Sequence, residues 1–198
     1  MFVDKNCYFC ALNSFEKDMK TPFIQIEDKQ FELFISEEDI LEGIDRVSTE
    51  INKDFQNKKP LFLCVLNGAF MFASELIGRF ESECEVTFIG LKSYKGTERN
   101  ENIKTISGLN KDIKDRNVII IEDIIDSGFT MDFLLKTIKD ENPKSVRVAS
   151  LLFKPDALQT DIRPDYTVKK IANDFIVGFG LDYKEQGRNL RNIYKIKY

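Results

Sequence analysis

Short continuous apolar runs alternate along the chain with stretches in which apolar residues recur at helical spacing. The runs predict buried strands, and the helical spacing predicts three intervening helices. The predicted strands are 61–66, 86–91, 118–121, 146–152 and 175–179, and the predicted helices follow Ser36 and cover 70–80 and 130–141. This alternation predicts an α/β fold with a mostly parallel central sheet, flanked by helices on both faces.

The boundaries between these elements carry their own signals. Ser36 and Asp39 stand three residues apart at the start of the first helix, in the manner of a capping box. The polar stretch 92–117 contains two glycines and many charges, so we expect a mobile loop there. Residues 1–22 are interpreted as an N-terminal extension and residues 23–198 as one domain.

Composition narrows the class of protein. The 198 residues are 42% apolar and 31% charged, with a formal net charge of −4. These values are ordinary for a globular domain, and the acidic balance argues against a nucleic-acid partner. The sequence has no apolar run long enough to span a membrane and no convincing secretion signal, so we expect a cytoplasmic protein.

Histidine is absent from the sequence, and cysteine is scarce. The lack of histidine excludes Ser-His and Cys-His nucleophile pairs, so acid–base chemistry must come from carboxylates, Lys, Tyr or Cys. Cys7 and Cys10 form a C-x-x-C pair, but the second pair or histidines of a zinc site are missing. We therefore interpret the pair as part of a variable extension, and Cys64, within an apolar run, as a buried thiol.

The segment 118–131, VIIIEDIIDSGFTM, carries the strongest chemical signal. Ligands of open α/β sheets bind beyond the carboxyl ends of strands, which is where Glu122 and Asp123 fall. Ser127, Gly128 and Thr130 precede or open a helix and provide hydroxyls, close backbone approach and a helix N-terminus for a phosphate. Ionised carboxylates accept hydrogen bonds from sugar hydroxyls, so the segment predicts a sugar-phosphate site rather than an ordinary capped turn.

The same segment closely resembles the phosphoribosyl-pyrophosphate signature of type I phosphoribosyltransferases, and most specifically their hypoxanthine–guanine branch. The resemblance extends over about residues 30–198, through LFLCVLNGAFMFASEL, LKSYKGT, VRVASLLFKPDA and FIVGFGLDYKEQGRNLRNIY. It implies a small hood formed by the N- and C-terminal segments, and a homodimer or homotetramer. It also implies Mg²⁺-dependent transfer of the phosphoribosyl group to hypoxanthine or guanine, giving IMP or GMP and pyrophosphate in purine salvage.

The resemblance also assigns roles to individual residues. Asp126 matches the general acid/base that faces purine N7. The ribose and 5′-phosphate positions are Glu122, Asp123, Asp126, Ser127, Gly128, Phe129 and Thr130. The pyrophosphate positions are Leu66, Asn67, Gly68 and Arg188, with a cis Leu66–Asn67 peptide bond, and Ser93 and Tyr94 begin the flexible catalytic loop.

The purine positions are Lys154, Phe175, Ile176 and Asp182, and the magnesium positions are Glu122, Asp123 and Asp182. The ammonium of Lys154 can only donate hydrogen bonds, so it favours a 6-oxo group over the amino group of adenine.

Three positions depart from the family pattern: Phe129 and Asn67 replace basic residues, and Gly187 replaces an aromatic residue. We expect Gly187 to make the loop that holds Arg188 more flexible.

Three alternative functions fit parts of the sequence. The first is a phosphoribosyltransferase for xanthine, a pyrimidine or another base, and the second is a non-catalytic sensor of phosphoribosyl pyrophosphate. Retention of Asp126, Lys154 and Asp182 argues against the sensor. A dinucleotide-binding fold is rejected because Gly178 and Gly180 supply only a fragment of the G-x-G-x-x-G motif.

Overall fold

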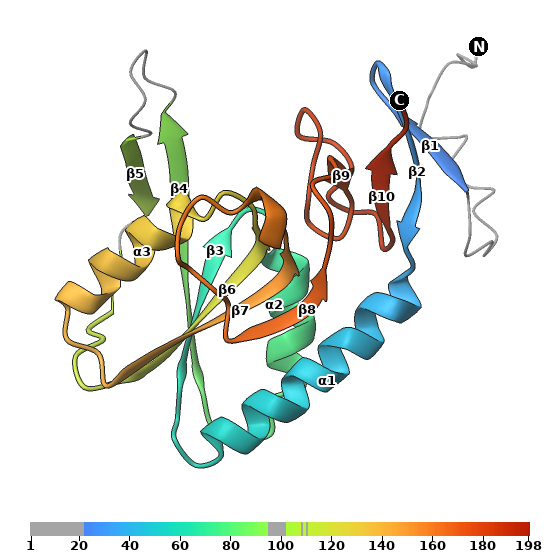
Figure 1. Cartoon of the computed structure of the whole chain (residues 1–198). Coiled ribbons are helices and arrows are strands. Elements are labelled where there is room, and N and C mark those ends of the chain that lie inside the picture. Colours follow the sequence, from blue (N-terminus) through green and yellow to red (C-terminus); the bar gives the residue numbers. More distant parts are fainter. Residues whose placement is uncertain (1–21, 95–101, 108, 110) are drawn as a thin grey trace, which may run out of the picture.

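The computed structural model describes residues 22–94, 102–107, 109 and 111–198, of which 92–94 and 102–107 are described by their backbone alone. A six-stranded sheet forms the body of the molecule, and a smaller four-stranded sheet stands beside it (Figure 1). The larger sheet has the strand order β5-β4-β3-β6-β7-β8. Its strands are β3 (Leu61–Leu66), β4 (Glu85–Tyr94), β5 (Asn102–Ser107), β6 (Asn117–Ile125), β7 (Ser145–Phe153) and β8 (Tyr166–Lys170). All neighbouring pairs are parallel except β4 and β5, which confirms the predicted mostly parallel sheet.

Three helices cover the two faces of the larger sheet. They are α1 (Glu37–Phe55), α2 (Phe70–Gly78) and α3 (Phe129–Asp140). Side chains of β3 alternate between the faces: Phe62 and Cys64 pack in the core with α1 and α2, whereas Leu61 and Leu63 pack in the core with α3. Both faces are therefore buried, which explains why the central strands are continuous apolar runs.

The predicted start of α1 is confirmed. Ser36 precedes the helix with extended backbone angles, and its hydroxyl accepts a 3.1 Å hydrogen bond from the backbone N–H of Asp39. Three acidic residues follow in the first turn, where the positive end of the helix dipole favours negative charge.

The smaller sheet is the predicted hood, and it is built from both ends of the described chain. Its strands, in spatial order, are β1 (Phe23–Ile26), β2 (Lys29–Ile35), β10 (Ile193–Ile196) and β9 (Ile176–Val177), all antiparallel. A 2.7 Å hydrogen bond from the Glu37 N–H to Asn192 Oδ1 ties the C-terminal segment of the hood to the start of α1.

The structure corrects the prediction of the fifth parallel strand. The fifth parallel strand is Tyr166–Lys170, not 175–179; the latter segment supplies the two-residue β9 of the hood. Gly178 and Gly180 have φ values of 103° and 102°, so the backbone leaves the extended conformation after Val177. The edge strand β8 was missed because only Tyr166 and Val168 of its five residues are buried.

The stretch 92–117, where a mobile loop is predicted, also contributes backbone to two strands. The backbone of β4 continues to Tyr94, and β5 pairs with it in antiparallel register, Tyr94 opposite Asn102. Backbone pairing at a sheet edge does not require apolar side chains, so the hydrophobic pattern did not reveal it. Among the described residues, no helix is long and apolar enough to cross a membrane.

Candidate active site

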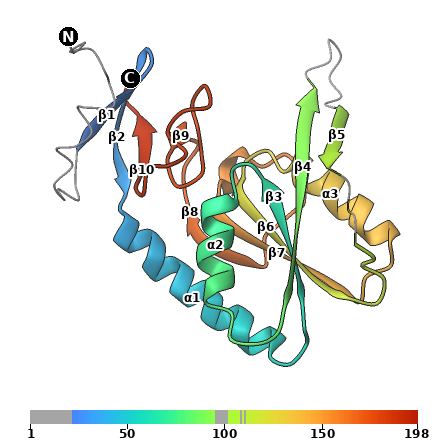
Figure 2. The same cartoon turned by 180° about the vertical axis from the view of Figure 1, so that it is seen from behind.

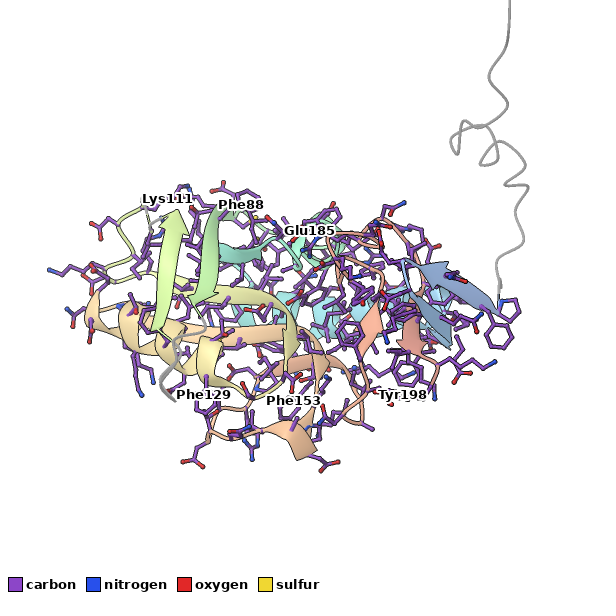
Figure 3. All side chains as sticks on the ribbon, turned by 90° about the horizontal axis from the view of Figure 1, so that it is seen from above. Phe88, Lys111, Phe129, Phe153, Glu185 and Tyr198 are labelled. Atoms are coloured by element: carbon purple, nitrogen blue, oxygen red, sulfur yellow. The ribbon has the colours of Figure 1, made fainter. Side chains whose placement is uncertain are left out.

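The loop between β6 and α3 surrounds a hollow of about 250 Å³ at the carboxyl end of the sheet. Besides Ile124 and Ile125, the hollow is lined by seven residues of the predicted sugar-phosphate segment: Glu122, Asp123, Asp126, Ser127, Gly128, Thr130 and Met131. The structure thus brings the predicted acids, hydroxyls and glycine into one place. Phe129 is the exception: it is the first residue of α3, it does not line the hollow, and its side chain is 42% exposed (Figure 3).

Gly128 is required at the turn into α3. Its φ is +86°, and a Cβ atom there would lie 2.2 Å from Thr160 Oγ1 and 2.8 Å from Leu158 Cδ1. The Gln159 N–H also donates a 2.9 Å hydrogen bond to the Ser127 carbonyl. Residues 158–160 therefore pack against the β6–α3 loop and support it. The sequence did not predict this role, because it depends on a contact between segments that are distant in the chain.

Glu122 and Asp123 form a carboxyl pair at the end of β6. Burial, together with the negative charge of Asp123, raises the pKa of Glu122 well above its usual value. Burial raises the pKa of Asp123 as well, although hydrogen bonds from Glu122 and from the Ile124 N–H, at 2.8 Å, act in the opposite direction. The Oε2 atom of Glu122 is buried and has no hydrogen-bond partner among the residues that the structure describes. A buried, unpartnered acceptor of this kind invites a cation or a hydroxyl donor.

The predicted pyrophosphate segment lies directly against this pair. The Leu66–Asn67 peptide bond is cis, as predicted. A Cβ atom on Gly68 would lie 1.5 Å from Asp123 Oδ2, so the backbone approaches the carboxylate more closely than any other residue allows. A Cβ on Gly180 would in turn lie 1.9 Å from the Gly68 carbonyl oxygen. Glycines therefore let three segments far apart in the sequence meet around Gly68, which contacts Asp123 on one side and Gly180 on the other.

Arg188 reaches the same region from the hood side. Its Nη2 lies 2.6 Å from Asp182 Oδ1, and its Nη1 donates a 2.9 Å hydrogen bond to the Gly180 carbonyl. The charge of Arg188 also lowers the pKa of Asp123, against the larger effect of burial. Two residues that the sequence analysis assigned to different ligands, Arg188 and Asp182, are thus paired with each other in the free protein.

Gly187 is held in place by its neighbours. Its φ is +92°, and a Cβ atom there would lie 2.9 Å from Ile26 Cδ1 in the hood. The side chain of Gln186 donates a hydrogen bond to Glu27, which joins this loop to the β1–β2 turn. Glycine at this position therefore serves a tight packing contact, and the expectation that it loosens the loop has no support in the contacts.

Lys154 lies at the end of β7, beside the predicted acid/base. Its side chain is 7% exposed, and its Nζ lies 2.8 Å from Oδ2 of Asp126, a side chain that is 50% exposed. The backbone N–H of Lys154 donates to the Ile125 carbonyl at 2.9 Å, which keeps β6 and β7 paired up to the site. Asn173 Oδ1 lies 3.5 Å from the same ammonium. Asn173 was not identified from sequence, because no motif marks it.

Phe175 has a partly exposed ring. It is 43% exposed, and its ring centroid lies 5.8 Å from that of Tyr183 and 6.3 Å from that of Phe31. These aromatic contacts hold one side of the ring against the hood. Ile176 follows in β9, an edge strand of the hood, so one side of its backbone has no partner strand within the described ranges.

The carboxylates fit a magnesium ion only in part. Within the described ranges, no three Asp, Glu or Cys side chains are arranged to hold a metal ion. Asp182 is committed to Arg188, whereas the buried free oxygen of Glu122 and the adjacent Asp123 offer hard oxygen ligands. Mg²⁺ typically binds one or two carboxylates and completes its shell with water and substrate phosphates, so these two residues suffice for that mode.

Several predicted features fall outside the described parts of the chain. Residues 95–101 and the side chains of Ser93 and Tyr94 are among them, as are Cys7, Cys10 and the N-terminal extension. Their predicted roles stay predictions. Cys64 is buried, as predicted, and burial raises the pKa of its thiol to about 12.

Comparison with known proteins gives the family. The model of the phosphoribosyl transferase domain matches residues 36–184. The hypoxanthine-guanine phosphoribosyltransferase of Streptococcus thermophilus is 39% identical over 166 residues, which are 83% of this chain and 92% of that protein. The corresponding protein of Streptococcus mutans is 37% identical, over 87% of this chain and 96% of that protein.

Solved structures agree with this assignment. A hypoxanthine phosphoribosyltransferase from Staphylococcus aureus has a TM-score of 0.80 at 33% identity, covering 84% of this chain and 91% of that one. One from Trypanosoma cruzi has a TM-score of 0.76 at 28% identity, covering 83% of this chain and 95% of that one. With the fold, the hood and the β6–α3 loop in agreement, the chain belongs to the phosphoribosyl transferase family and, within it, to the hypoxanthine-guanine phosphoribosyltransferases.

Proposed function

We propose that this enzyme transfers the 5-phosphoribosyl group from phosphoribosyl pyrophosphate to hypoxanthine and guanine, releasing pyrophosphate and forming IMP and GMP. The observation that carries the proposal is the 2.8 Å pair of Lys154 Nζ and Asp126 Oδ2. A 6-oxopurine presents a carbonyl oxygen and N7 as neighbours on one edge of its rings. A fixed donor beside a fixed acceptor matches an O6 acceptor beside an N7–H donor.

The two residues of this pair would then divide the work. Lys154 donates a hydrogen bond to O6 and orients the base. Asp126, which is half exposed to the hollow, accepts the proton of N7 while another ring nitrogen of the base forms its bond to the anomeric carbon of the ribose. Adenine places an amino donor where O6 would be, against an ammonium that can only donate, so it is disfavoured.

The rest of the base site lies on the hood side. The exposed face of Phe175 is available for stacking on the purine, since its other contacts are with Phe31 and Tyr183. The unpaired side of β9 at Ile176 offers backbone groups to the far edge of the base. These placements support the roles that family resemblance assigns to the two residues.

The phosphoribosyl half would occupy the β6–α3 loop. Ser127, Gly128 and Thr130 would bind the 5′-phosphate at the start of α3, and Glu122 and Asp123 the ribose hydroxyls. A Mg²⁺ ion bound with the substrate would neutralise pyrophosphate oxygens, with Glu122 and Asp123 as its protein ligands. Arg188, held by Asp182 in the free protein, would exchange one carboxylate partner for the leaving pyrophosphate.

The cytoplasmic location and a homodimeric or homotetrameric state are part of the same proposal. The oligomeric state is carried over from the resemblance to the family, whereas the location is carried over from the sequence analysis. Sedimentation of the purified chain measures the oligomeric state directly.

An ultraviolet assay of nucleotide formation tests the proposed reaction. The enzyme is supplied with phosphoribosyl pyrophosphate, Mg²⁺ and, in separate reactions, hypoxanthine, guanine, xanthine or adenine. We expect turnover with hypoxanthine and guanine and little or none with adenine. Turnover confined to xanthine or to a pyrimidine would overturn the choice of base. If no base led to release of pyrophosphate, the result would favour a non-catalytic sensor.

A further inference from the structure

A second hollow lies at the opposite edge of the larger sheet from the candidate active site. Its volume is about 400 Å³, within the range of sites that bind small molecules. It is lined where β6, β7 and β8 begin, by Asn117, Ser145 and Tyr166, and where α1 ends, by Asp54 and Phe55. The carboxyl ends of the strands, which carry the active site, point to the other side of the body (Figure 2).

Three cations surround this hollow: Lys58, Lys144 and Arg147. Arg147 is paired with Asp165 at 2.7 Å. For Lys58 and Lys144, no carboxylate lies within ion-pair distance in the part of the chain that the structure describes, and Lys58 lies over the Phe55 ring. An excess of positive charge at one concave site in a chain of net charge −4 indicates an anionic ligand.

The turns that carry the two lysines are held in place by hydrogen bonds. Asn117 Nδ2 donates to the Lys58 carbonyl at 3.2 Å, and the Ser145 hydroxyl donates to Asn117 Oδ1 at 2.8 Å. The Lys144 N–H donates to the Arg116 carbonyl at 2.8 Å. The backbone around the hollow is therefore fixed before any ligand binds, which lowers the entropic cost of binding.

One side of the hollow carries an acceptor. The Tyr166 hydroxyl donates a 2.7 Å hydrogen bond to Asp54 Oδ2, and burial and the carboxylate raise the tyrosine pKa, so this donor stays protonated. The other oxygen of Asp54 has no hydrogen-bond partner among the described residues. It can accept a hydrogen bond from a hydroxyl group of a ligand.

We propose that this hollow, which we call the amino-edge site, binds a phosphorylated sugar, free or as part of a nucleotide. The phosphate lies among Lys58, Lys144 and Arg147, and a sugar hydroxyl donates to Asp54. Lysine and arginine side chains bind phosphate through charge-assisted hydrogen bonds, and 400 Å³ exceeds what inorganic phosphate alone fills. The site is separate from the β6–α3 loop and does not depend on the proposed reaction.

Nuclear magnetic resonance of the ¹⁵N-labelled full chain tests the proposal, because it reports on each edge of the sheet separately. Ribose 5-phosphate, AMP, inorganic phosphate and uncharged ribose are titrated in separate samples. We expect ribose 5-phosphate or AMP to shift the amide signals of Asn117 and Ser145, in addition to any shifts at 126–130. Shifts at 126–130 alone would remove the amino-edge site. Binding of inorganic phosphate as tight as that of ribose 5-phosphate and AMP would overturn the role of the sugar.

A charge-reversal pair tests the lysines. In the double variant Lys58→Glu/Lys144→Glu, affinity at the amino-edge site should fall by about tenfold or more for each lysine, since each loses a charge-assisted hydrogen bond to the phosphate. The matched control is Lys114→Glu/Lys139→Glu, which changes the net charge equally at two exposed lysines outside the hollow. An equal loss of affinity in both double variants would show non-specific attraction and refute the site. An otherwise unchanged amide spectrum verifies that each variant is folded.

Discussion

The ammonium of Lys154 lies 2.8 Å from the carboxylate of Asp126, so the two side chains that would read a purine base are partners in the free protein. They come from the ends of the adjacent parallel strands β6 and β7, which keeps both at the same edge of the sheet. Lys154 is nearly buried and Asp126 is half exposed. An incoming base can therefore reach the carboxylate while the ammonium stays in place.

Asp126→Asn tests the proton-transfer role. The amide keeps the size of the side chain and can still accept a hydrogen bond from Lys154, but it cannot take up the N7 proton. We expect kcat with hypoxanthine to fall by about 10²–10⁴-fold, the usual contribution of a general acid or base. The measurement is steady-state turnover in the ultraviolet assay, together with binding of phosphoribosyl pyrophosphate, which should change little.

Asp132→Asn is the matched control, because it makes the same change at a partly exposed carboxylate on α3 that pairs with Lys136. It should leave kcat unchanged. Full turnover by Asp126→Asn would show that proton transfer uses another group.

Lys154→Met tests base selection. Methionine has a similar length and suits the buried position, but it has no donor for a 6-oxo group. We expect kcat/KM for hypoxanthine to fall and the preference over adenine to shrink by about tenfold or more, since charged hydrogen bonds are worth about 1.5–3 kcal/mol. The measurement is kcat/KM with each base.

The control for this variant is Lys169→Met, at an exposed lysine of β8. An unaltered preference for hypoxanthine over adenine in Lys154→Met would assign discrimination elsewhere in the site. The thermal unfolding midpoint separates this outcome from a loss of folded protein.

Gly68→Ala tests the convergence of segments at Asp123. A Cβ atom would lie 1.5 Å from Asp123 Oδ2, so either the backbone or the carboxylate must move. Overpacking of this kind costs about 1–3 kcal/mol, and here the strain falls on the proposed ribose and magnesium ligand. We expect KM for phosphoribosyl pyrophosphate to rise by about tenfold or more, with a lowered unfolding midpoint.

Gly78→Ala is a matched control within the same chain. Gly78 ends α2, and a Cβ atom there meets nothing within 4 Å. Alanine should leave catalysis unchanged and stabilise the helix by up to about 1 kcal/mol. Equal KM values for the two variants would show that the close approach of Gly68 to Asp123 has no part in binding.

The features predicted best from the sequence are those that are local in the chain. Four of the apolar strands (61–66, 86–91, 118–121 and 146–152), the cap at Ser36 and the β6–α3 loop each depend on residues a few positions apart, and each was placed correctly. The fifth parallel strand was placed wrongly because FIVGF has the more apolar composition, whereas β8 is a half-buried edge strand. Local hydrophobicity does not reveal which sheet a strand joins.

The pairings inside the site were beyond the reach of sequence patterns. The salt bridge between Asp182 and Arg188 depends on how the hood loop folds back on itself. The contact of Thr160 with Gly128 joins segments about 30 residues apart that share no motif. Family resemblance identified most of these residues one by one, but their partners in the free protein depend on tertiary contacts.

Glu85 should make stability depend on pH. It lies at the start of β4, with Lys111 at 2.8 Å and Arg116 at 2.9 Å, and their hydrogen bonds lower its pKa from 4.5 to about 2. Because the folded-state pKa is lowered, the contribution to stability is complete above pH 4.5 and is lost as the pH falls toward 2.

Comparison of the wild-type chain with Glu85→Gln measures this contribution. Near neutral pH the variant should unfold at a lower urea concentration than the wild-type chain. This gap between the two urea midpoints should narrow steadily below about pH 4. Because these groups are solvent-accessible, high salt should narrow it too. Glu83→Gln, which breaks a more exposed pair with Lys59, should show a smaller gap at neutral pH. A gap between wild type and Glu85→Gln that stays constant from about pH 7 to about pH 3 would mean that Glu85 acts through packing rather than through its charge.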